Sequence, residues 1–251
     1  MWNSEWEWEW KNVGTALRTF QIAVRCSILP STMDRFTEPH FERSALVSVD
    51  VQRDVLDGQP MEIPGTSDAL PAMGWVARAF RTAGLPVVHV VRLYLADGSN
   101  ADLCRRSRLQ RGDRMLSAGS PGAEIADELL PNASTRLDTE LLLAGGIQSV
   151  GTREVVVYKP RWGAFFRTSL EEHLRSLKVD TLVVMGCNFP NCPRTTMYEA
   201  SERDFRVVCV EDALSGLYDQ GRKELDHIGV IRMRAFNVAE SLGKASALHA
   251  S

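Results

Sequence analysis

The chain has 251 residues, of which 44% are hydrophobic and 24% are charged, and its formal net charge is −3. This composition is typical of a globular protein, and the lack of a basic surplus argues against a nucleic-acid partner. No segment approaches the ~18 consecutive apolar residues of a membrane span, which argues against a membrane protein. Five cysteines without the spacing of a disulfide framework favour a reducing, cytoplasmic setting.

The N-terminal residues differ in composition from the rest of the chain. Residues 1–26 contain four of the six tryptophans, and glutamates alternate with several of them. A secretory signal needs a basic start and an uninterrupted apolar stretch, and this segment has neither. We therefore interpret residues 1–40 as a poorly ordered N-terminal extension, with Met33 as an equally good start, and residues 41–251 as one domain.

Strand-like and helix-like patterns alternate from Ser44 onward. Residues 45–51 form a short apolar run rich in β-branched residues, as expected of a strand covered on both faces. Residues 95–122 are polar, basic and irregular, and long loops of this kind are usually functional or disordered. With right-handed crossovers, the alternation predicts a parallel sheet with helices on both faces. The further strands are predicted at 85–94, 153–159, 180–186 and 206–214, and helices at 66–84, 120–130, 168–179, 193–205 and 219–242.

Three reactive side chains lie where predicted strands end. Asp50 ends the first strand, Lys159 ends the third, and Cys192 follows the fourth by one tight loop. Because ligands of open parallel sheets bind at the carboxyl ends of the strands, we expect the three side chains to share one cleft. An acid, an ammonium group and a thiol are the parts of an activated-nucleophile site. Each residue alone has an ordinary alternative, as a turn aspartate, a solvated lysine or a buried small cysteine.

The residue types suggest a different chemical role for each of Asp50, Lys159 and Cys192. An ordinary cysteine thiol has a pKa near ~8.5. The N-terminus of the helix predicted from Pro193 and the Lys159 ammonium group are expected to lower the pKa of Cys192. Asp50 is a candidate to accept the thiol proton and later return it to a leaving nitrogen. Main-chain amides of the turn "NFPNC" are candidates to bind the developing oxyanion.

Three segments carry a resemblance to a known family. "ALVSVDVQRDVL" has an Asp-x-Gln-x-Asp signature beginning at Asp50, "VVYKPRWGAFF" has a Lys-x-Arg-x-x-Ala-Phe signature beginning at Lys159, and "GCNFPNCPRTTMYEA" places Cys192 six residues after Gly186. Together they resemble the isochorismatase-like cysteine hydrolases, which include nicotinamidases, N-carbamoylsarcosine amidase, and ureidoacrylate and biuret-type amidohydrolases. The resemblance implies a three-layer α/β/α sandwich with a mainly parallel central sheet. It also implies a catalytic triad of Asp50, Lys159 and Cys192.

The resemblance further implies hydrolysis of a C–N bond in a small amide, imide or ureido substrate through a thioester on the cysteine. The backbone amides of Asn188 and Cys192 would bind the oxyanion. A cis peptide is expected shortly before the nucleophile, with Cys187–Asn188 and Phe189–Pro190 as the two candidates. Relatives commonly assemble as dimers or tetramers, so a homo-oligomer is expected.

Departures from the family pattern narrow these expectations. Nicotinamidases carry an Asp-x-His metal site soon after the first strand, whereas the corresponding segment here has no histidine. We interpret His89 and His173 as structural or surface residues, so we expect neither a metal nor another cofactor. Isochorismatases lack the cysteine and cleave an enol ether, and Cys192 argues against that chemistry.

Substrate contacts are predicted by position only. Gln52, Trp162 and Phe189 are candidates to contact a small-molecule substrate, although the two aromatic residues could equally belong to the core. Arg92, at the end of the second strand, is a candidate to hold a substrate carboxylate, with a surface salt bridge as the alternative. Two other classes of function remain open: a non-catalytic binding or scaffold protein on the same fold, and a cysteine-based oxidoreductase.

Overall fold

The computed structural model describes residues 34–249, and all structural statements below refer to that range. The predicted N-terminal extension therefore falls largely outside the described residues. At the start of the described range, the His40 side chain contacts the Asp180 carboxylate, with Nδ1 2.7 Å from Oδ2.

The described residues form a seven-stranded sheet with the order β3-β4-β2-β1-β5-β6-β7. All neighbouring pairs are parallel except β3 and β4, which are antiparallel. The central strands are predominantly apolar and buried on both faces, as expected of parallel strands covered by helices. The strands span Ser44–Val49 (β1), Val87–Val91 (β2), Ile147–Gly151 (β3), Glu154–Tyr158 (β4), Thr181–Gly186 (β5), Arg206–Leu214 (β6) and Ile231–Met233 (β7).

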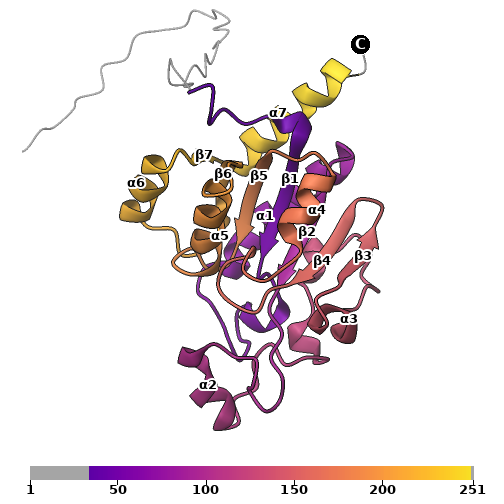
Figure 1. The fold of residues 1–251 in the computed structure, drawn as a ribbon, viewed down its shortest axis with the longest axis vertical. Coiled ribbons are helices and arrows are strands. Elements are labelled where there is room, and N and C mark those ends of the chain that lie inside the picture. Colours follow the sequence, from indigo (N-terminus) through magenta and orange to yellow (C-terminus); the bar gives the residue numbers. More distant parts are fainter. Residues whose placement is uncertain (1–33, 250–251) are drawn as a thin grey trace, which may run out of the picture. The chain divides into compact units, whose positions relative to one another are not determined.

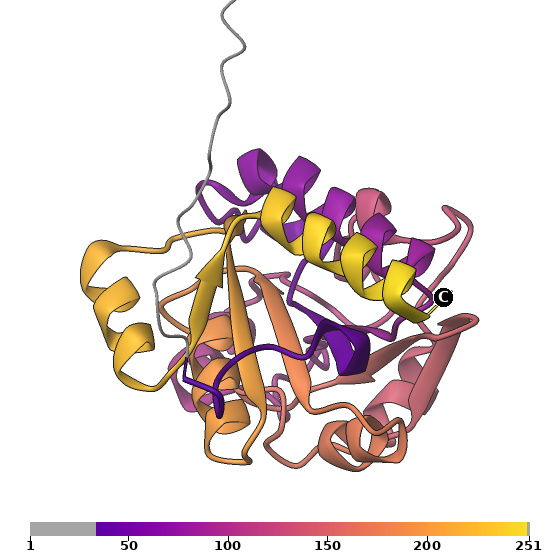
Figure 2. The same cartoon turned by 90° about the horizontal axis from the view of Figure 1, so that it is seen from above.

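Helices cover both faces of this sheet and form two separate hydrophobic cores. Figure 2 shows α1 and α7 side by side over one face, and their apolar residues form a single cluster with the side chains of that face. Buried residues of α4, α5 and α6 form the second cluster with the opposite face. The predicted three-layer α/β/α sandwich is thus confirmed. The helices span Thr66–Thr82 (α1), Leu103–Gln110 (α2), Thr139–Leu143 (α3), Leu170–Ser176 (α4), Cys192–Ser201 (α5), Asp219–His227 (α6) and Ala235–His249 (α7).

Several parts of the predicted element order were wrong, and the helices α2 and α3 were not predicted. The helix predicted at 120–130 is instead two short 3₁₀ turns, Pro121–Ala123 and Asp127–Leu129. The tract predicted as one helix from 219 to 242 is interrupted by Gly229, whose φ of 72° ends α6, and by β7, which pairs with β6. The half-exposed edge strand β3 was missed.

The long polar loop after β2 contains α2 and lies beyond one end of the sheet (Figure 1). It forms a small core of its own, which includes Tyr94, Leu109 and Met115. The Asp54 carboxylate fixes part of this loop, because its Oδ2 accepts a 2.6 Å hydrogen bond from the Leu116 amide. None of the helices between residues 34 and 249 is both long and apolar enough to cross a membrane.

Candidate active site

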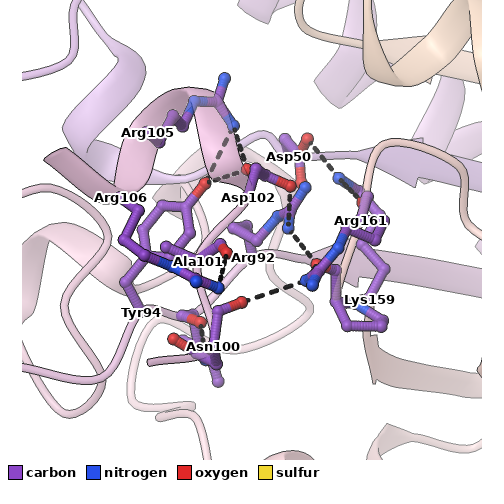
Figure 3. A network of polar contacts seen from close by, with 12 residues as sticks. Asp50, Arg92, Tyr94, Asn100, Ala101, Asp102, Arg105, Arg106, Lys159 and Arg161 are labelled. Carbon is purple, nitrogen blue, oxygen red and sulfur yellow. Dashed lines mark hydrogen bonds and ion pairs between the residues drawn. The ribbon is translucent and has the colours of Figure 1, made fainter. Parts of the chain in front are cut away.

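Four adjacent strands bring the candidate residues to one edge of the sheet. In the order β4-β2-β1-β5, the residues that directly follow the first three strands are Lys159, Arg92 and Asp50. Cys192 is the first residue of α5, which follows β5 after a short turn. Figure 3 shows the Arg92 side chain lying among Asp50, Lys159 and Asp102. Parallel strand direction is what gathers these residues from distant parts of the sequence.

Gly186, at the end of β5, permits the close approach of β1 beside this edge. Its φ is 130°, and an added Cβ would lie 2.2 Å from the Val49 carbonyl oxygen. No L-residue fits here without moving the β1 backbone. The glycine therefore keeps the turn that carries Cys192 tightly joined to the strand that carries Asp50.

The main chain of Asp50 is held in an uncommon conformation. Its φ is 55°, in the left-handed region that aspartate tolerates better than most residues. The amide donates to the Val90 carbonyl at 2.9 Å, and the carbonyl accepts from the Gln52 amide and from the Cys187 thiol, both at 3.0 Å. These bonds fix the direction in which the carboxylate leaves the strand.

The two carboxylate oxygens of Asp50 have different surroundings. Oδ2 lies 2.8 Å from the Lys159 Nζ, and this lysine side chain is fully buried. The same Nζ donates to the Arg161 carbonyl at 3.2 Å, which completes its attachment to the site. Oδ1 is buried and has no hydrogen-bond partner within residues 34–249. One oxygen is thus neutralised, while the other is free to accept a proton.

Cys192 is 3% exposed, and its thiol lies within electrostatic reach of the Asp50 carboxylate. Burial and then the Asp50 carboxylate raise the pKa of the Cys192 thiol to about 11, while Lys159 and Arg92 act in the opposite direction. The expectation that the lysine and the helix would lower this pKa overall was therefore wrong. The reason is that the site is closed to water and the nearest charged group is an anion. The free thiol keeps its proton next to a carboxylate able to take it.

The turn before Cys192 presents two unused main-chain donors. The cis peptide is Cys187–Asn188, which decides between the two predicted positions. The Phe189 amide donates to Ser215 and the Asn191 amide donates to the Asn188 carbonyl. Across the range the structure describes, the amides of Asn188 and Cys192 have no hydrogen-bond acceptor. They are the pair that the sequence suggested for the oxyanion.

Two of the four residues predicted as substrate contacts, Gln52 and Phe189, contact other parts of the fold. Gln52 is fully buried and joins main-chain segments: its Nε2 donates to the carbonyls of Arg92 at 2.9 Å and Ala123 at 2.6 Å, and its Oε1 accepts from the Arg92 amide. Phe189 is also fully buried, and its ring packs edge-on against Tyr218 at 5.4 Å. Both side chains point into the fold, because the turn geometry after each strand decides side-chain direction.

The other two residues predicted as substrate contacts, Arg92 and Trp162, lie close to each other. Arg92 is 1% exposed, so it makes no surface salt bridge, and its Nη1 donates to the Pro160 carbonyl at 2.6 Å and to Asp102 at 3.2 Å. The Arg92 guanidinium carbon lies 5.9 Å from the half-buried Trp162 ring. The guanidinium carbon of Arg105, in α2, lies 4.6 Å from the same ring.

Sequence reasoning missed Tyr94, Asp102 and Arg105, which surround Arg92. The Tyr94 hydroxyl donates to Asp102 at 3.0 Å and accepts from Arg105 at 2.9 Å. The basic character of residues 95–122 was the available signal, but the sequence alone did not show which of its arginines would turn inward. The described residues contain no group of three or more His, Cys, Asp or Glu arranged to hold a metal ion.

Fold and site together define a three-layer α/β protein with a buried cysteine, carboxylate and lysine at the carboxyl edge of its sheet. The isochorismatase domain model matches residues 44–138 and 146–234. The chain therefore belongs to the isochorismatase family.

Individual relatives agree with this assignment. The structure resembles that of an isochorismatase family protein from Desulfovibrio vulgaris, with 31% identity, a TM-score of 0.68, and coverage of 80% of this chain and 98% of that one. N-carbamoylsarcosine amidase from Thermoplasma acidophilum gives 26% identity and a TM-score of 0.61, over 77% of this chain and 96% of that one. By sequence, the chain is 27% identical over 177 residues to an Arabidopsis thaliana protein named a probable inactive nicotinamidase, covering 69% of this chain and 81% of that one.

Proposed function

We propose that the protein is an amidohydrolase in which Cys192 attacks the carbonyl carbon of a small amide, imide or ureido substrate. The observation that carries this proposal is the difference in surroundings between the two carboxylate oxygens of Asp50. Oδ2 is paired with Lys159 at 2.8 Å, Oδ1 has no hydrogen-bond partner within residues 34–249, and the carboxylate raises the pKa of the Cys192 thiol. A nucleophile, its base and a third group that orients the base are the parts of an activated-nucleophile site.

The first half of the reaction moves one proton through Asp50. Oδ1 takes the Sγ proton as Sγ bonds to the carbonyl carbon, and the negative charge moves to the carbonyl oxygen. The unused amides of Asn188 and Cys192 donate to that oxyanion. When the oxyanion collapses, the C–N bond breaks and Asp50 gives its proton to the departing nitrogen. An acyl thioester on Cys192 and a free amine or ammonia result.

The second half releases the acid. Asp50, again a carboxylate, accepts a proton from water as the water oxygen bonds to the thioester carbon. The C–S bond then breaks, and the thiolate regains a proton from Asp50. Lys159 stays bound to Oδ2 throughout, so it orients the base and stabilises negative charge on the carboxylate and on sulfur.

The named relatives support C–N bond hydrolysis as the reaction class. They include N-carbamoylsarcosine amidase from Arthrobacter, of which the chain spans only 59%, and ureidoacrylate amidohydrolase from Acinetobacter baylyi. Because one relative is named a probable inactive nicotinamidase, the competing function is that of a non-catalytic binding protein. The four cysteines of the described range are free thiols, which supports our proposal of a reducing, cytoplasmic setting.

Rapid-quench mass spectrometry of the intact protein tests this function. With a panel of amides and ureido compounds, we expect ammonia or amine release together with a transient mass increase on the peptide that contains Cys192. Both should vanish in Cys192→Ala and persist in Cys104→Ala, which changes an exposed cysteine. Substrate binding without an adduct or amine release would favour the binding protein. Thiol cycling with peroxide in place of amine release would favour the oxidoreductase.

A further inference from the structure

One edge of the Arg92 guanidinium group is buried without a partner. Nη1 is occupied by Pro160 and Asp102, but Nε and Nη2 have no hydrogen-bond acceptor within residues 34–249. The whole residue is 1% exposed, so bulk water does not solvate these donors. Donors buried without acceptors are rare in native proteins because each forfeits its hydration. The free edge therefore has the character of a binding site.

The two donors on this edge have a defined geometry. Nε–H and the neighbouring Nη2–H are parallel and lie in the plane of the guanidinium group, so together they match the two oxygens of a carboxylate. The opposite side of the group is anchored by the Pro160 carbonyl at 2.6 Å, which fixes the plane. The site thus offers two parallel N–H donors whose orientation is already fixed.

The charges around Arg92 do not balance. Asp102 faces two guanidinium groups, that of Arg92 at 3.2 Å and that of Arg105 at 3.4 Å. The neighbouring Tyr94 adds no negative charge at neutral pH, because burial raises the pKa of its hydroxyl further above its ordinary value. The single charge of Asp102 does not compensate both guanidinium groups, and a charge without a partner is expensive in a site largely closed to water. A negatively charged ligand would reduce this excess of positive charge.

Arg92 lies within electrostatic reach of the Cys192 sulfur. Arg92 and Lys159 are the two groups whose positive charge opposes the rise in the Cys192 pKa, and Cys192 also acts electrostatically on Arg105. In Figure 3 the Arg92 side chain lies between Asp102 and the Asp50–Lys159 pair. The Trp162 ring packs against both arginines and forms an apolar wall at the same place.

We propose that Arg92 binds a carboxylate of the substrate through Nε and Nη2, so that the enzyme acts on monoamides or ureido derivatives of short carboxylic acids. This inference rests on the proposed hydrolase function. The two coplanar oxygens of a carboxylate match the parallel Nε–H and Nη2–H donors of this fork. Arg105 supports the site through Asp102 and through the Trp162 ring.

Direct binding is measured with the Cys192→Ala protein, which cannot turn the ligands over. Isothermal titration calorimetry would compare malonamate, succinamate and glutaramate with the matching neutral diamides. We expect at least one monoamide carboxylate to bind ~10-fold or more tightly than its diamide, the discrimination typical of a buried charged hydrogen-bonding group. Equal binding of a carboxylate and its diamide across the series, or binding of neither, would overturn the proposal.

Variants assign the effect to Arg92. Arg92→Met combined with Asp102→Asn removes the buried pair together and leaves no unpaired carboxylate, so the fold is more easily kept. We expect this double variant to lose the preference for carboxylates. Arg92→Lys, which keeps the charge but not the fork, should lose part of the preference and serves as the test if the double variant does not fold. Arg108→Met is the matched control, because Arg108 lies on α2 but pairs at the surface with Asp113. A preference unchanged in both Arg92 variants would contradict the assignment.

The two levels of the proposal fail in different ways. If carboxylate ligands bind through Arg92 but the wild-type protein forms no adduct on Cys192 and releases no amine from any of them, the binding inference stands and the hydrolase function fails. If the wild type forms the adduct but hydrolyses diamides with the same kcat/KM as monoamide carboxylates, the hydrolase stands and the carboxylate inference fails.

Discussion

Two buried ionic clusters share strand β2, and they differ in how completely they are satisfied. In the first, His89 contacts Glu154 at 2.6 Å, and Arg81 donates to both oxygens of the same carboxylate at 2.8 and 2.6 Å. In the second, Arg92 faces Asp102 with two of its three side-chain nitrogens unused, and the nearby Asp50 keeps one unused oxygen. His89, Glu154, Arg92 and Asp102 are buried, whereas the Arg81 side chain is 23% exposed.

The difference separates a structural cluster from one available for chemistry. Burying a charge is tolerated when every hydrogen-bonding atom has a partner, and the Glu154 cluster meets that condition. Without a ligand, the Asp50 and Arg92 side chains each keep atoms that have no hydrogen-bond partner. Nearby Gln52 shows that a buried polar side chain in the same region can have all of its polar atoms hydrogen-bonded. Unpaired atoms at the edge of the sheet thus point to the site more clearly than burial or charge does.

The largest expected effect is on catalysis at Asp50. Asp50→Asn removes the proton acceptor while keeping nearly the same shape, so we expect kcat to fall ~10²–10⁴-fold. Steady-state kinetics of amine release would measure this. Asp57→Asn, at an exposed position, is the control and should leave kcat unchanged. A kcat for Asp50→Asn close to that of wild type would remove Asp50 from the mechanism.

The structural cluster should respond in the opposite way. Glu154→Gln leaves Arg81 and His89 without their carboxylate, and we expect a loss of about 3–5 kcal/mol in the free energy of unfolding. The kcat/KM of the folded enzyme should not change. Urea denaturation gives the first quantity, with Glu171→Gln as the control, since that exposed ion pair should contribute under about 1 kcal/mol. Activity lost in Glu154→Gln without loss of stability would invalidate the comparison.

The same cluster predicts an acid dependence of stability. Hydrogen bonds from Arg81 and His89 outweigh burial and lower the pKa of Glu154 from 4.5 to about 2. Because the folded-state pKa is depressed, this stabilisation is fully present above the unfolded value near 4.5 and is lost as the pH falls toward 2. The stability difference between wild type and Glu154→Gln should therefore shrink between pH ~6 and ~3. A difference that stays constant with pH would argue against an ionised Glu154.

The smallest effect is expected at Phe189. Because its ring is fully buried and packs against Tyr218, Phe189→Leu should lower the free energy of unfolding by about 1 kcal/mol. KM should stay the same, which kinetics on the best substrate would show. A clear rise in KM with unchanged stability would restore Phe189 as a substrate contact.

The sequence predicted the central fold and the meeting of distant residues for a physical reason. Buried parallel strands have an unmistakable apolar pattern, and their carboxyl ends share one edge, so Asp50 and Lys159 could be placed together. Short or half-exposed strands such as β3 and β7 lack that pattern.

Side-chain direction and protonation could not be predicted in this way. Position relative to a strand end did not distinguish Gln52, which turns into the fold, from Arg92, which keeps a free edge. Nor did it reveal that burial and Asp50 together outweigh Lys159 at the thiol. Those outcomes depend on contacts between segments far apart in the chain.

The coupling between Asp50 and Cys192 is the central claim, and a thiol titration tests it most directly. The ultraviolet absorbance of the Cys192 thiolate would be followed against pH in wild type and in Asp50→Asn, with Cys192→Ala as the blank. We expect a pKa of about 11 in wild type. In Asp50→Asn the pKa should be clearly lower, because the anion is gone while Lys159 remains. A wild-type thiol that ionises below neutral pH, or a pKa that Asp50→Asn leaves unchanged, would contradict the account.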